Sequence, residues 1–354
     1  MNTENRTLRK DSPAGCSEER RPGSCTIQKF KKQKNTDEQN YNGSGMISRI
    51  MLDYFFVLWE TGRVQCGLLR SPESVAGKTL REVKIVKIGD REFDTEHHTY
   101  VMGILNVTPD SFSDGGKYDR LDAALFHAQE MIGEGADLLD VGGESTRPGY
   151  TPVSAEEEIA RTAPVLEALK ARFDIPLSLD TCKSEVAEAG FEAGADLLND
   201  IWGLRRDEKM AGTAAKWRKP CCLMHNRDEA VYENFLPEMK DDLLKSVRLA
   251  RAAGIAEDQI ILDPGIGFGK TYEQNLSAMK HLEDFCALGY PVLLGASKKS
   301  VIGLTLDVPA GQRGAGTIAS TVLAVMKGCA FVRVHDVKEN VQAVRMTEAV
   351  LEAE

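Results

Sequence analysis

Along most of the chain, short apolar runs alternate with longer amphipathic stretches, beginning near residue 100. The runs contain little polar alternation, which predicts strands buried on both faces, and therefore parallel strands covered by helices. Each run ends in a polar residue, so polar groups would gather at one edge of the sheet. The predicted strands are residues 100–106, 138–141, 177–180, 197–200, 221–225, 260–263, 292–297 and 331–335.

The amphipathic stretches between these runs carry apolar residues at helical spacing. Eight strand–helix units predict a closed (β/α)8 TIM barrel, an α/β fold whose active site lies at the carboxyl ends of the strands. An open, doubly wound sheet is the alternative. The predicted helices are residues 123–131, 155–172, 183–193, 207–217, 241–253, 275–288, 316–327 and 337–351.

Local signals mark some helix ends. Ser154 stands three residues before Glu157, which is the spacing of a capping box at a helix N-terminus. The sequence Gly-Ala-Asp recurs at 135–137 and 194–196, each time between a predicted helix and a predicted strand. Glycine at that place suits the left-handed turn that follows a helix.

The N-terminal part has a different character. Residues 1–45 are polar with almost no apolar periodicity, so they bury too little surface to offset the entropy of ordering, and we expect disorder. The alternating run at 83–93, V-K-I-V-K-I-G-D-R-E-F, predicts a β-hairpin that turns at Gly89-Asp90. We therefore predict a largely disordered N-terminal extension over residues 1–80 and a barrel domain over residues 81–354.

Composition narrows the classes of function. The chain has 354 residues and a formal net charge of −10, which argues against a nucleic-acid-binding surface. No secretory signal is present, and the most apolar early window, residues 50–59, is too short to span a bilayer, so we expect no membrane partner. The eight cysteines form no Cys-x-x-Cys pair, which predicts the reduced thiols of a cytoplasmic protein, without disulfides or a zinc site.

The polar residues at the predicted strand ends divide into two chemical sets. Asp180, Asn199 and Asp263 offer carboxylates and an amide, which suit a heterocycle with ring N–H and amino donors. Buried carboxylates need donors or a cationic partner, and Lys299 could be that partner.

The second set would bind an anion. Arg147, Arg333 and His335 supply charged donors, and the planar fork of arginine suits phosphate oxygens. Asn106, with loop carboxylates, could hold Mg²⁺ beside a leaving diphosphate, because magnesium prefers oxygen ligands. A heterocycle at one end and a diphosphate at the other suggest transfer of a heterocyclic alkyl group without a protein nucleophile.

Some residues have a simpler interpretation. We interpret Asp140 as a structural residue at a strand end, and His225 as a satisfied core or loop histidine. The sequence at 269–271, Gly-Lys-Thr, lacks the glycine that a P-loop requires five residues earlier, where Pro264 stands. Phe268, in the loop after the sixth strand, is available to stack on an aromatic ring.

These residues closely resemble the dihydropteroate synthase family. The longest matching motifs are GILNVTPDSFSDGG at 103–116 and DVGGESTRPG at 140–149. The resemblance covers residues from about 83 to the C-terminus, and the preceding extension lies outside it. The other matches are LDTCK at 179–183, Asn199-Asp200, residues 223–225, DPGIGF at 263–268, residues 295–300 and RVHD at 333–336.

The resemblance implies that 6-hydroxymethyl-7,8-dihydropterin diphosphate and 4-aminobenzoate give 7,8-dihydropteroate and diphosphate, in folate biosynthesis. Diphosphate would leave first, and the amine of 4-aminobenzoate would then capture the pterin methylene. By position, Lys299, Arg333 and Asp180 would be the catalytic residues. The implied binding residues are Asp180, Asn199, Met224, Asp263, Lys299 and Arg333 for the pterin; Asn106, Arg147, Arg333 and His335 for the diphosphate, with Mg²⁺ at Asn106; and Phe112, Asp114, Thr146, Pro148, Phe268 and Ser300 for 4-aminobenzoate and its two mobile loops.

The family also implies a cytoplasmic homodimer formed through barrel helices, and sensitivity to sulfonamides as mimics of 4-aminobenzoate. Lys298 departs from the family, which more often has arginine there, so the charge is kept and the planar fork is lost. Two other functions are alternatives. A methyltetrahydrofolate-dependent corrinoid methyltransferase would not need the diphosphate set, and a non-catalytic pterin-binding relative would have lost loop or diphosphate residues.

Overall fold

The structure is a computed structural model, and it describes residues 85–108, 117–145 and 152–354. The chain divides into two units, Met1–Ala76 and Gly77–Glu354, and the fold described below belongs to the second. The predicted disorder of residues 1–45 lies outside the described residues, as does the whole predicted extension over residues 1–80.

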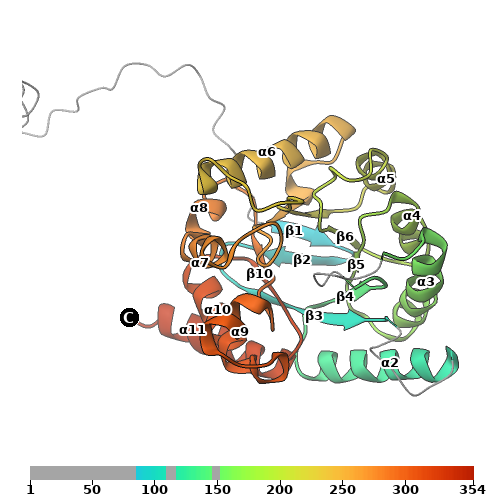
Figure 1. Ribbon diagram of the computed structural model, residues 1–354. Helices are drawn as coiled ribbons and strands as arrows, with labels where there is room; N and C mark the ends of the chain where they lie inside the picture. Colours follow the sequence, from blue (N-terminus) through green and yellow to red (C-terminus); the bar gives the residue numbers. More distant parts are fainter. Residues whose placement is uncertain (1–84, 109–116, 146–151) are drawn as a thin grey trace, which may run out of the picture. The chain divides into compact units, whose positions relative to one another are not determined.

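Eight parallel strands surround a common centre, with helices outside them (Figure 1). Their hydrogen-bonded order is β8-β7-β6-β5-β4-β3-β10-β9, and a parallel bridge between Leu262 and Val292 joins the two ends of this order. The predicted TIM barrel is confirmed. The strands are β3 (Tyr100–Asn106), β4 (Leu138–Gly142), β5 (Leu177–Asp180), β6 (Leu197–Asp200), β7 (Cys221–Met224), β8 (Ile260–Asp263), β9 (Leu293–Leu294) and β10 (Phe331–Val334).

The helices agree with the predicted windows, with four main differences. The window 123–131 begins earlier, at Lys117. The window 275–288 is two helices, because the backbone at His281 leaves helical geometry. A helix over 300–306 was not predicted, since its β-branched and apolar residues gave no clear period. The window 241–253 begins earlier, at Phe235. The helices are α2 (Lys117–Gly133), α3 (Ala155–Arg172), α4 (Ser184–Glu192), α5 (Met210–Trp217), α6 (Phe235–Ala253), α7 (Tyr272–Lys280), α8 (Leu282–Cys286), α9 (Ser300–Leu306), α10 (Gly314–Met326) and α11 (Val337–Leu351), with 3-10 turns η2 (Glu257–Gln259) and η3 (Ala310–Gln312).

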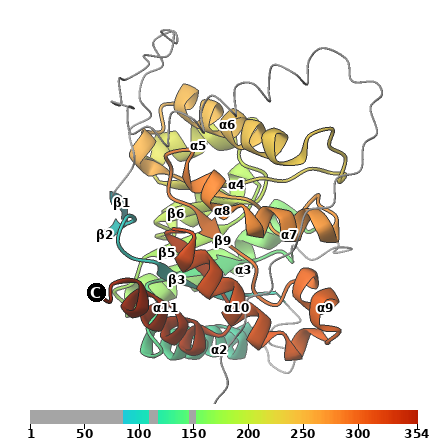
Figure 2. The same cartoon turned by 90° about the vertical axis from the view of Figure 1, so that its left-hand side faces the viewer.

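The predicted hairpin closes one end of the barrel. It consists of β1 (Ile85–Ile88) and β2 (Arg91–Asp94), which pair antiparallel, and Figure 2 shows it at the N-terminal ends of the barrel strands. Its buried side chains, Val86, Ile88 and Phe93, pack on the first inward-facing residues of the barrel. This inner apolar layer consists of Met102, Leu138, Leu197, Cys222, Ile261, Leu293 and Phe331.

The opposite end of the barrel interior is polar. Side chains two residues apart on a strand share one face, so the position two residues beyond each apolar one also faces inward. The residues between them, such as Leu139, Leu198 and Val332, pack outward against the helices. Inward-facing positions near the carboxyl ends therefore include Asp140, Asn199, Met224, Asp263 and Arg333.

The repeated Gly-Ala-Asp sequence fixes the strands at the closed end. Gly135 and Gly194 have φ values of 100° and 106°, as expected for the turn after a helix. Asp137 Oδ2 accepts a hydrogen bond from the Val101 amide at 2.7 Å, and Asp196 Oδ2 accepts one from the Leu177 amide at 3.1 Å. Each aspartate thus binds the start of the preceding strand.

The predicted capping box is present only as a single cap, because the Glu157 side chain bonds Arg161. The Ser154 hydroxyl accepts a hydrogen bond from the Glu157 amide at 3.2 Å, so Ser154 caps α3. Among the described residues, no helix is both long and apolar enough to cross a bilayer.

Candidate active site

Four strands deliver the predicted pterin-binding residues to one place. Asp180 ends β5, Asn199 lies on β6, Asp263 ends β8 and Arg333 lies on β10. All four face the barrel interior at its polar end, and the three on β5, β6 and β8 are buried. Met224, which ends β7, is also buried there and supplies an apolar wall.

Arg333 joins two carboxylates across the site. Its Nε donates to Asp140 Oδ2 at 2.5 Å, and its Nη2 donates to Asp180 Oδ2 at 2.8 Å. Burial alone would lower the pKa of Arg333, but the charges of Asp140 and Asp180 hold that pKa above its ordinary value. The guanidinium is therefore permanently charged and fixed along the edge formed by Nε and Nη2.

The two predicted carboxylates are both held in an environment that favours protonation. Burial raises the pKa of Asp180 to about 7, although Arg333 opposes the shift. Burial also raises the pKa of Asp263, while Lys299 and the Gly265 amide oppose that shift. Asp263 Oδ1 accepts from the Gly265 amide at 2.7 Å, so this oxygen is already bonded.

Lys299 lies at the same end of the barrel, but its bonds differ from the expectation. We expected Lys299 to be the cationic partner of both carboxylates, whereas the direct partner of Asp180 is Arg333. Lys299 Nζ donates to the Ile266 carbonyl at 2.5 Å and lies 4.6 Å from the centre of the Phe268 ring. Burial lowers the pKa of Lys299 to about 8, against the influence of Asp263. Lys299 therefore lies next to the loop after β8 and opposes the rise in the pKa of Asp263.

The loop after β8 is shaped by glycine and by a buried lysine. Gly265 has a φ of 68°, and a Cβ there would lie 2.0 Å from the His225 carbonyl oxygen, so glycine is required. Beneath the loop, Lys270 Nζ lies 2.9 Å from both the Gly265 and Phe268 carbonyl oxygens and 2.9 Å from His225 Nδ1. Burial lowers the pKa of Lys270 to about 7 and that of His225 to about 4. Lys270 thus supports the backbone that carries Phe268, and His225 acts with it as a structural residue.

The predicted anion-binding side is described in part. His335 follows Arg333 by two residues on the chain. Its Nδ1 lies 2.9 Å from Ser297 Oγ, and this contact orients the ring. Lys298, the departure from the family, has its Nζ 2.6 Å from Asp336 Oδ1. Ser300 begins α9 and is exposed. Five predicted site residues lie outside the described residues: Phe112, Asp114, Thr146, Arg147 and Pro148.

Sequence reasoning missed two groups at this end of the barrel. Asp140, interpreted as structural, contacts both Arg333 and Asn199, since its Oδ2 also accepts from Asn199 Nδ2 at 3.1 Å. Lys183 Nζ contacts Glu144 and Glu158 at 2.6 and 2.5 Å. The signal for Asp140 was present, because it stands two residues after the inward-facing Leu138.

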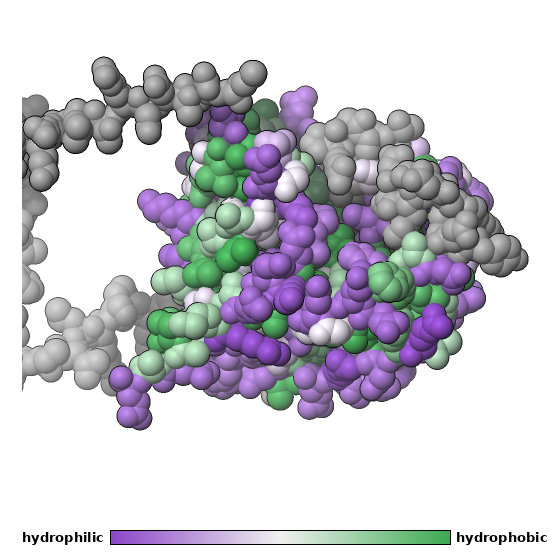
Figure 3. Space-filling model, turned by 90° about the horizontal axis from the view of Figure 1, so that it is seen from below, coloured by the Kyte–Doolittle hydropathy of each residue, from purple (hydrophilic) through white to green (hydrophobic). Residues whose placement is uncertain are grey.

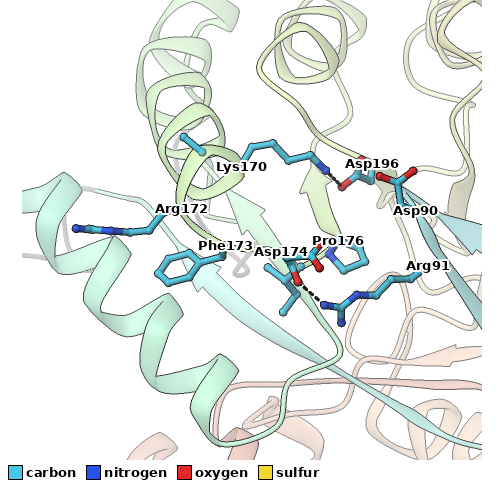
Figure 4. Close-up of a pocket in the computed structure, with 10 residues that line it drawn as sticks. Asp90, Arg91, Lys170, Arg172, Phe173, Asp174, Pro176 and Asp196 are labelled. Carbon is cyan, nitrogen blue, oxygen red and sulfur yellow. Dashed lines mark hydrogen bonds and ion pairs between the residues drawn. The ribbon is translucent and has the colours of Figure 1, made fainter.

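A cavity elsewhere on the molecule is a weaker candidate for the functional site. It has a volume of about 330 Å³ and lies between the hairpin turn and the segment joining α3 to β5, at the closed end of the barrel (Figure 4). Three of its charged side chains already have partners: Lys170 Nζ is 2.8 Å from Asp196 Oδ2, and Arg91 bonds the Asp174 carbonyl. It lacks the convergence of strand ends that characterises an active site in this fold.

The sequence and the fold are similar to those of known enzymes. The sequence matches the family described as "Pterin binding enzyme" over residues 102–335. A dihydropteroate synthase of Clostridium beijerinckii is 57% identical over 267 residues, which cover 75% of this chain and 99% of that protein.

Solved structures give the same result. A Xanthomonas albilineans dihydropteroate synthase with 4-aminobenzoic acid aligns with a TM-score of 0.73 and 42% identity, covering 77% of this chain and 100% of that chain. A structure of the Xanthomonas albilineans enzyme in complex with 7,8-dihydropteroate aligns with a TM-score of 0.71 and 40% identity, covering 76% and 100%. Together with the geometry of the polar end, these matches show that the chain belongs to the pterin binding enzymes and, within them, to the dihydropteroate synthase family.

Proposed function

We propose that this enzyme joins 6-hydroxymethyl-7,8-dihydropterin diphosphate to 4-aminobenzoate at the polar end of its barrel. In this reaction the bond between the pterin methylene carbon and the diphosphate oxygen breaks, and its electron pair leaves with diphosphate. The amine nitrogen of 4-aminobenzoate then bonds the methylene carbon and loses a proton, which gives 7,8-dihydropteroate. The observation that carries the proposal is the convergence of Asp180, Asn199, Asp263 and Arg333 from four strands.

The pterin would bind deepest, against these four residues and Met224. Asp180 and Asp263 supply acceptors for the ring N–H and amino groups of the pterin, while Arg333 supplies donors. Their burial excludes competing water and strengthens each of these hydrogen bonds. Lys299, at the loop side of the pocket, adds positive charge close to the leaving group. We assign Asp180, Lys299 and Arg333 as the catalytic residues on this basis.

Diphosphate would depart toward Arg333, His335, Arg147 and Asn106. Among the described residues, no group of three or more His, Cys, Asp or Glu side chains could hold a metal ion. This fits Mg²⁺ that takes most of its ligands from phosphate and water. We assign the ion to Asn106, which ends β3 beside Gly142 and offers an amide oxygen as a ligand. Bound Mg²⁺ would neutralise the charge of the leaving diphosphate.

4-Aminobenzoate would bind nearer the surface. Phe268 and Ser300 lie on the loop after β8 and at the start of α9, and we assign to the same subsite Phe112, Asp114, Thr146 and Pro148. Sulfonamides should compete with 4-aminobenzoate here. A Yersinia pestis dihydropteroate synthase has been solved in a sulfonamide drug complex, which supports this assignment.

We also propose a homodimer in the cytoplasm. Apolar side chains on α10 and α11 are exposed, with Met326 at 61%, Met346 at 66% and Val350 at 59%. Figure 3 shows a face of the molecule on which apolar patches lie between hydrophilic residues. Covering such side chains in a dimer would remove them from water. The free cysteines of the described residues agree with a reducing compartment. Light scattering of the purified chain tests the dimer.

The activity is tested by incubating the full-length protein with pterin diphosphate, 4-aminobenzoate and Mg²⁺. We expect dihydropteroate, identified by mass spectrometry, to form in equal amount with diphosphate. Reactions that lack one substrate serve as controls. Binding of the pterin is measured separately by fluorescence. Pterin binding without product would contradict the proposed reaction and favour a non-catalytic pterin-binding protein.

A further inference from the structure

Asp140 lies at the centre of the polar inner face. Its side chain is 0% exposed, and its place on β4 is paired with Ile104 of β3 and Ser178 of β5. A carboxylate fixed by strands on both sides cannot move toward solvent. It must therefore be stabilised by donors inside the barrel.

A single oxygen of Asp140 takes two donors from opposite directions. Asp140 Oδ2 accepts from Arg333 Nε at 2.5 Å and from Asn199 Nδ2 at 3.1 Å. In the strand order, β10 and β6 are each two strands away from β4, on opposite sides. Asp140 thus links two pterin-site residues that do not share a neighbouring strand.

This link decides which end of the Asn199 amide faces a ligand. An ionised carboxylate accepts hydrogen bonds and donates none, so the amide must turn its NH₂ group toward Asp140. The Asn199 Oδ1 atom is then left as an acceptor for a ligand N–H. Without Asp140, both orientations of the amide would be possible.

The same link fixes the free edge of Arg333. Because Nε bonds Asp140 and Nη2 bonds Asp180, the Nη1 group remains for an acceptor of the ligand. Asp180 alone would hold the guanidinium by one nitrogen, about which it could rotate. Two carboxylates at adjacent nitrogens set its plane.

Fold stability alone does not account for Asp140. Its second oxygen, Oδ1, is buried and has no hydrogen-bond partner among the described residues. A buried acceptor without a donor costs free energy, so an apolar residue would serve a purely structural role better.

We propose that Asp140 is a positioning residue that makes the pocket specific for a heterocycle with an N–H facing Asn199 and an acceptor facing Arg333. This inference rests on the proposed function, because the pterin is the substrate that would be read.

The test uses the full-length protein with Asp140→Asn. The variant should raise KM for pterin diphosphate roughly tenfold or more, and it should leave KM for 4-aminobenzoate close to the wild-type value. The acid limb of kcat/KM should also move to lower pH, because the charge of Asp140 raises the pKa of Asp180. A residue that only stabilises the fold would not raise KM for one substrate alone.

Ser178→Ala is the matched control. Ser178 shares the inner face and the strand pairing of Asp140, and its Oγ is likewise buried without a hydrogen-bond partner among the described residues. We expect this variant to keep both KM values within about twofold. Asp140→Glu keeps the charge but moves the carboxylate by one methylene, and it should raise the pterin KM as well. It replaces Asp140→Asn if thermal unfolding shows that the latter does not fold.

The outcomes separate the two proposals. A wild-type protein that binds no pterin and makes no product overturns the proposed function. An active wild type whose Asp140→Asn and Asp140→Glu variants both behave like Ser178→Ala overturns the positioning role alone. A crystal structure of either Asp140 variant with Arg333 and Asn199 unmoved would overturn the positioning role whatever the activity.

Discussion

The two ends of the barrel interior are built from the same strands and differ in polarity and charge. The end covered by the hairpin is apolar (the closed end), and the opposite end is polar and charged (the open end). On β10, Phe331 faces inward at the closed end and Arg333 faces inward two residues later at the open end. Phe331 packs with its ring centre 5.7 Å from that of Phe93 in the hairpin. Arg333 instead joins two carboxylates. Two residues along the strand therefore separate a packing side chain from a side chain of the candidate site.

This contrast shows which end of the barrel stabilises the fold and which end costs free energy of folding. The closed end consists of apolar side chains removed from water, which is the main favourable term in folding. At the open end, burial raises the pKa of Asp180 to about 7 and lowers that of Lys299 to about 8, so each charge there is held at a cost. Perturbed groups of this kind cluster at functional sites.

The largest effect should come from removing Arg333, the cation that joins two carboxylates at the open end. Arg333→Ala should lower kcat/KM by roughly a thousandfold, because the leaving diphosphate loses a fixed donor and the pterin loses its partner. Far-ultraviolet circular dichroism should still report a folded barrel. Lys298→Arg serves as a control, since the ion pair with Asp336 is retained, and its activity should stay within about twofold. Turnover near the wild-type value in Arg333→Ala would remove that residue from the mechanism.

A pH profile sharpens the contrast with an intermediate effect. Below about pH 7 Asp180 is protonated and loses its charge toward Arg333, so kcat/KM for pterin diphosphate should fall as pH decreases. Above about pH 8 Lys299 loses its proton, and kcat/KM should fall again. Each limb should approach tenfold per pH unit, with a maximum between the two values. A profile that stays flat from pH 5 to 9 would contradict these assignments.

The smallest effect should come from the closed end. Phe331→Leu should destabilise the fold by about 1 kcal/mol, because the shorter side chain packs less well against the hairpin. The kinetic constants at 25 °C should be unchanged within about twofold. Thermal unfolding and steady-state kinetics measure the two quantities on one sample. A selective rise in the KM for pterin would show that the two ends are coupled.

The sequence predicted the strands well because each apolar run ends where the inward face becomes polar. The predicted residues 100–106, 177–180, 197–200 and 260–263 coincide with β3, β5, β6 and β8. Strand 292–297 was predicted too long, because the pairing of Val292, Leu293 and Leu294 ends before the chain turns into the loop that carries Lys299.

Pairings within the site could not be predicted in the same way. Arg333 and Asp180 are 153 residues apart, and only the order and register of the strands bring them together. For this reason Lys299 was expected as the cationic partner of Asp180, whereas in the structure that partner is Arg333. Asp140 was interpreted as structural for the same reason. The inward position of Asp140 followed from its spacing to Leu138, but its contact with two functional residues required the closed barrel.

The aspartates of the two Gly-Ala-Asp sequences have a consequence for accuracy at the opposite end. Asp137 and Val101 exchange backbone and side-chain hydrogen bonds, as do Asp196 and Leu177, and these bonds set the alignment of neighbouring strands. A shift of one residue would turn every side chain of a strand to the other face. Asp140 lies three residues beyond Asp137, about 10 Å along the strand. The precision with which the site residues are positioned thus depends partly on hydrogen bonds at the other end of the barrel.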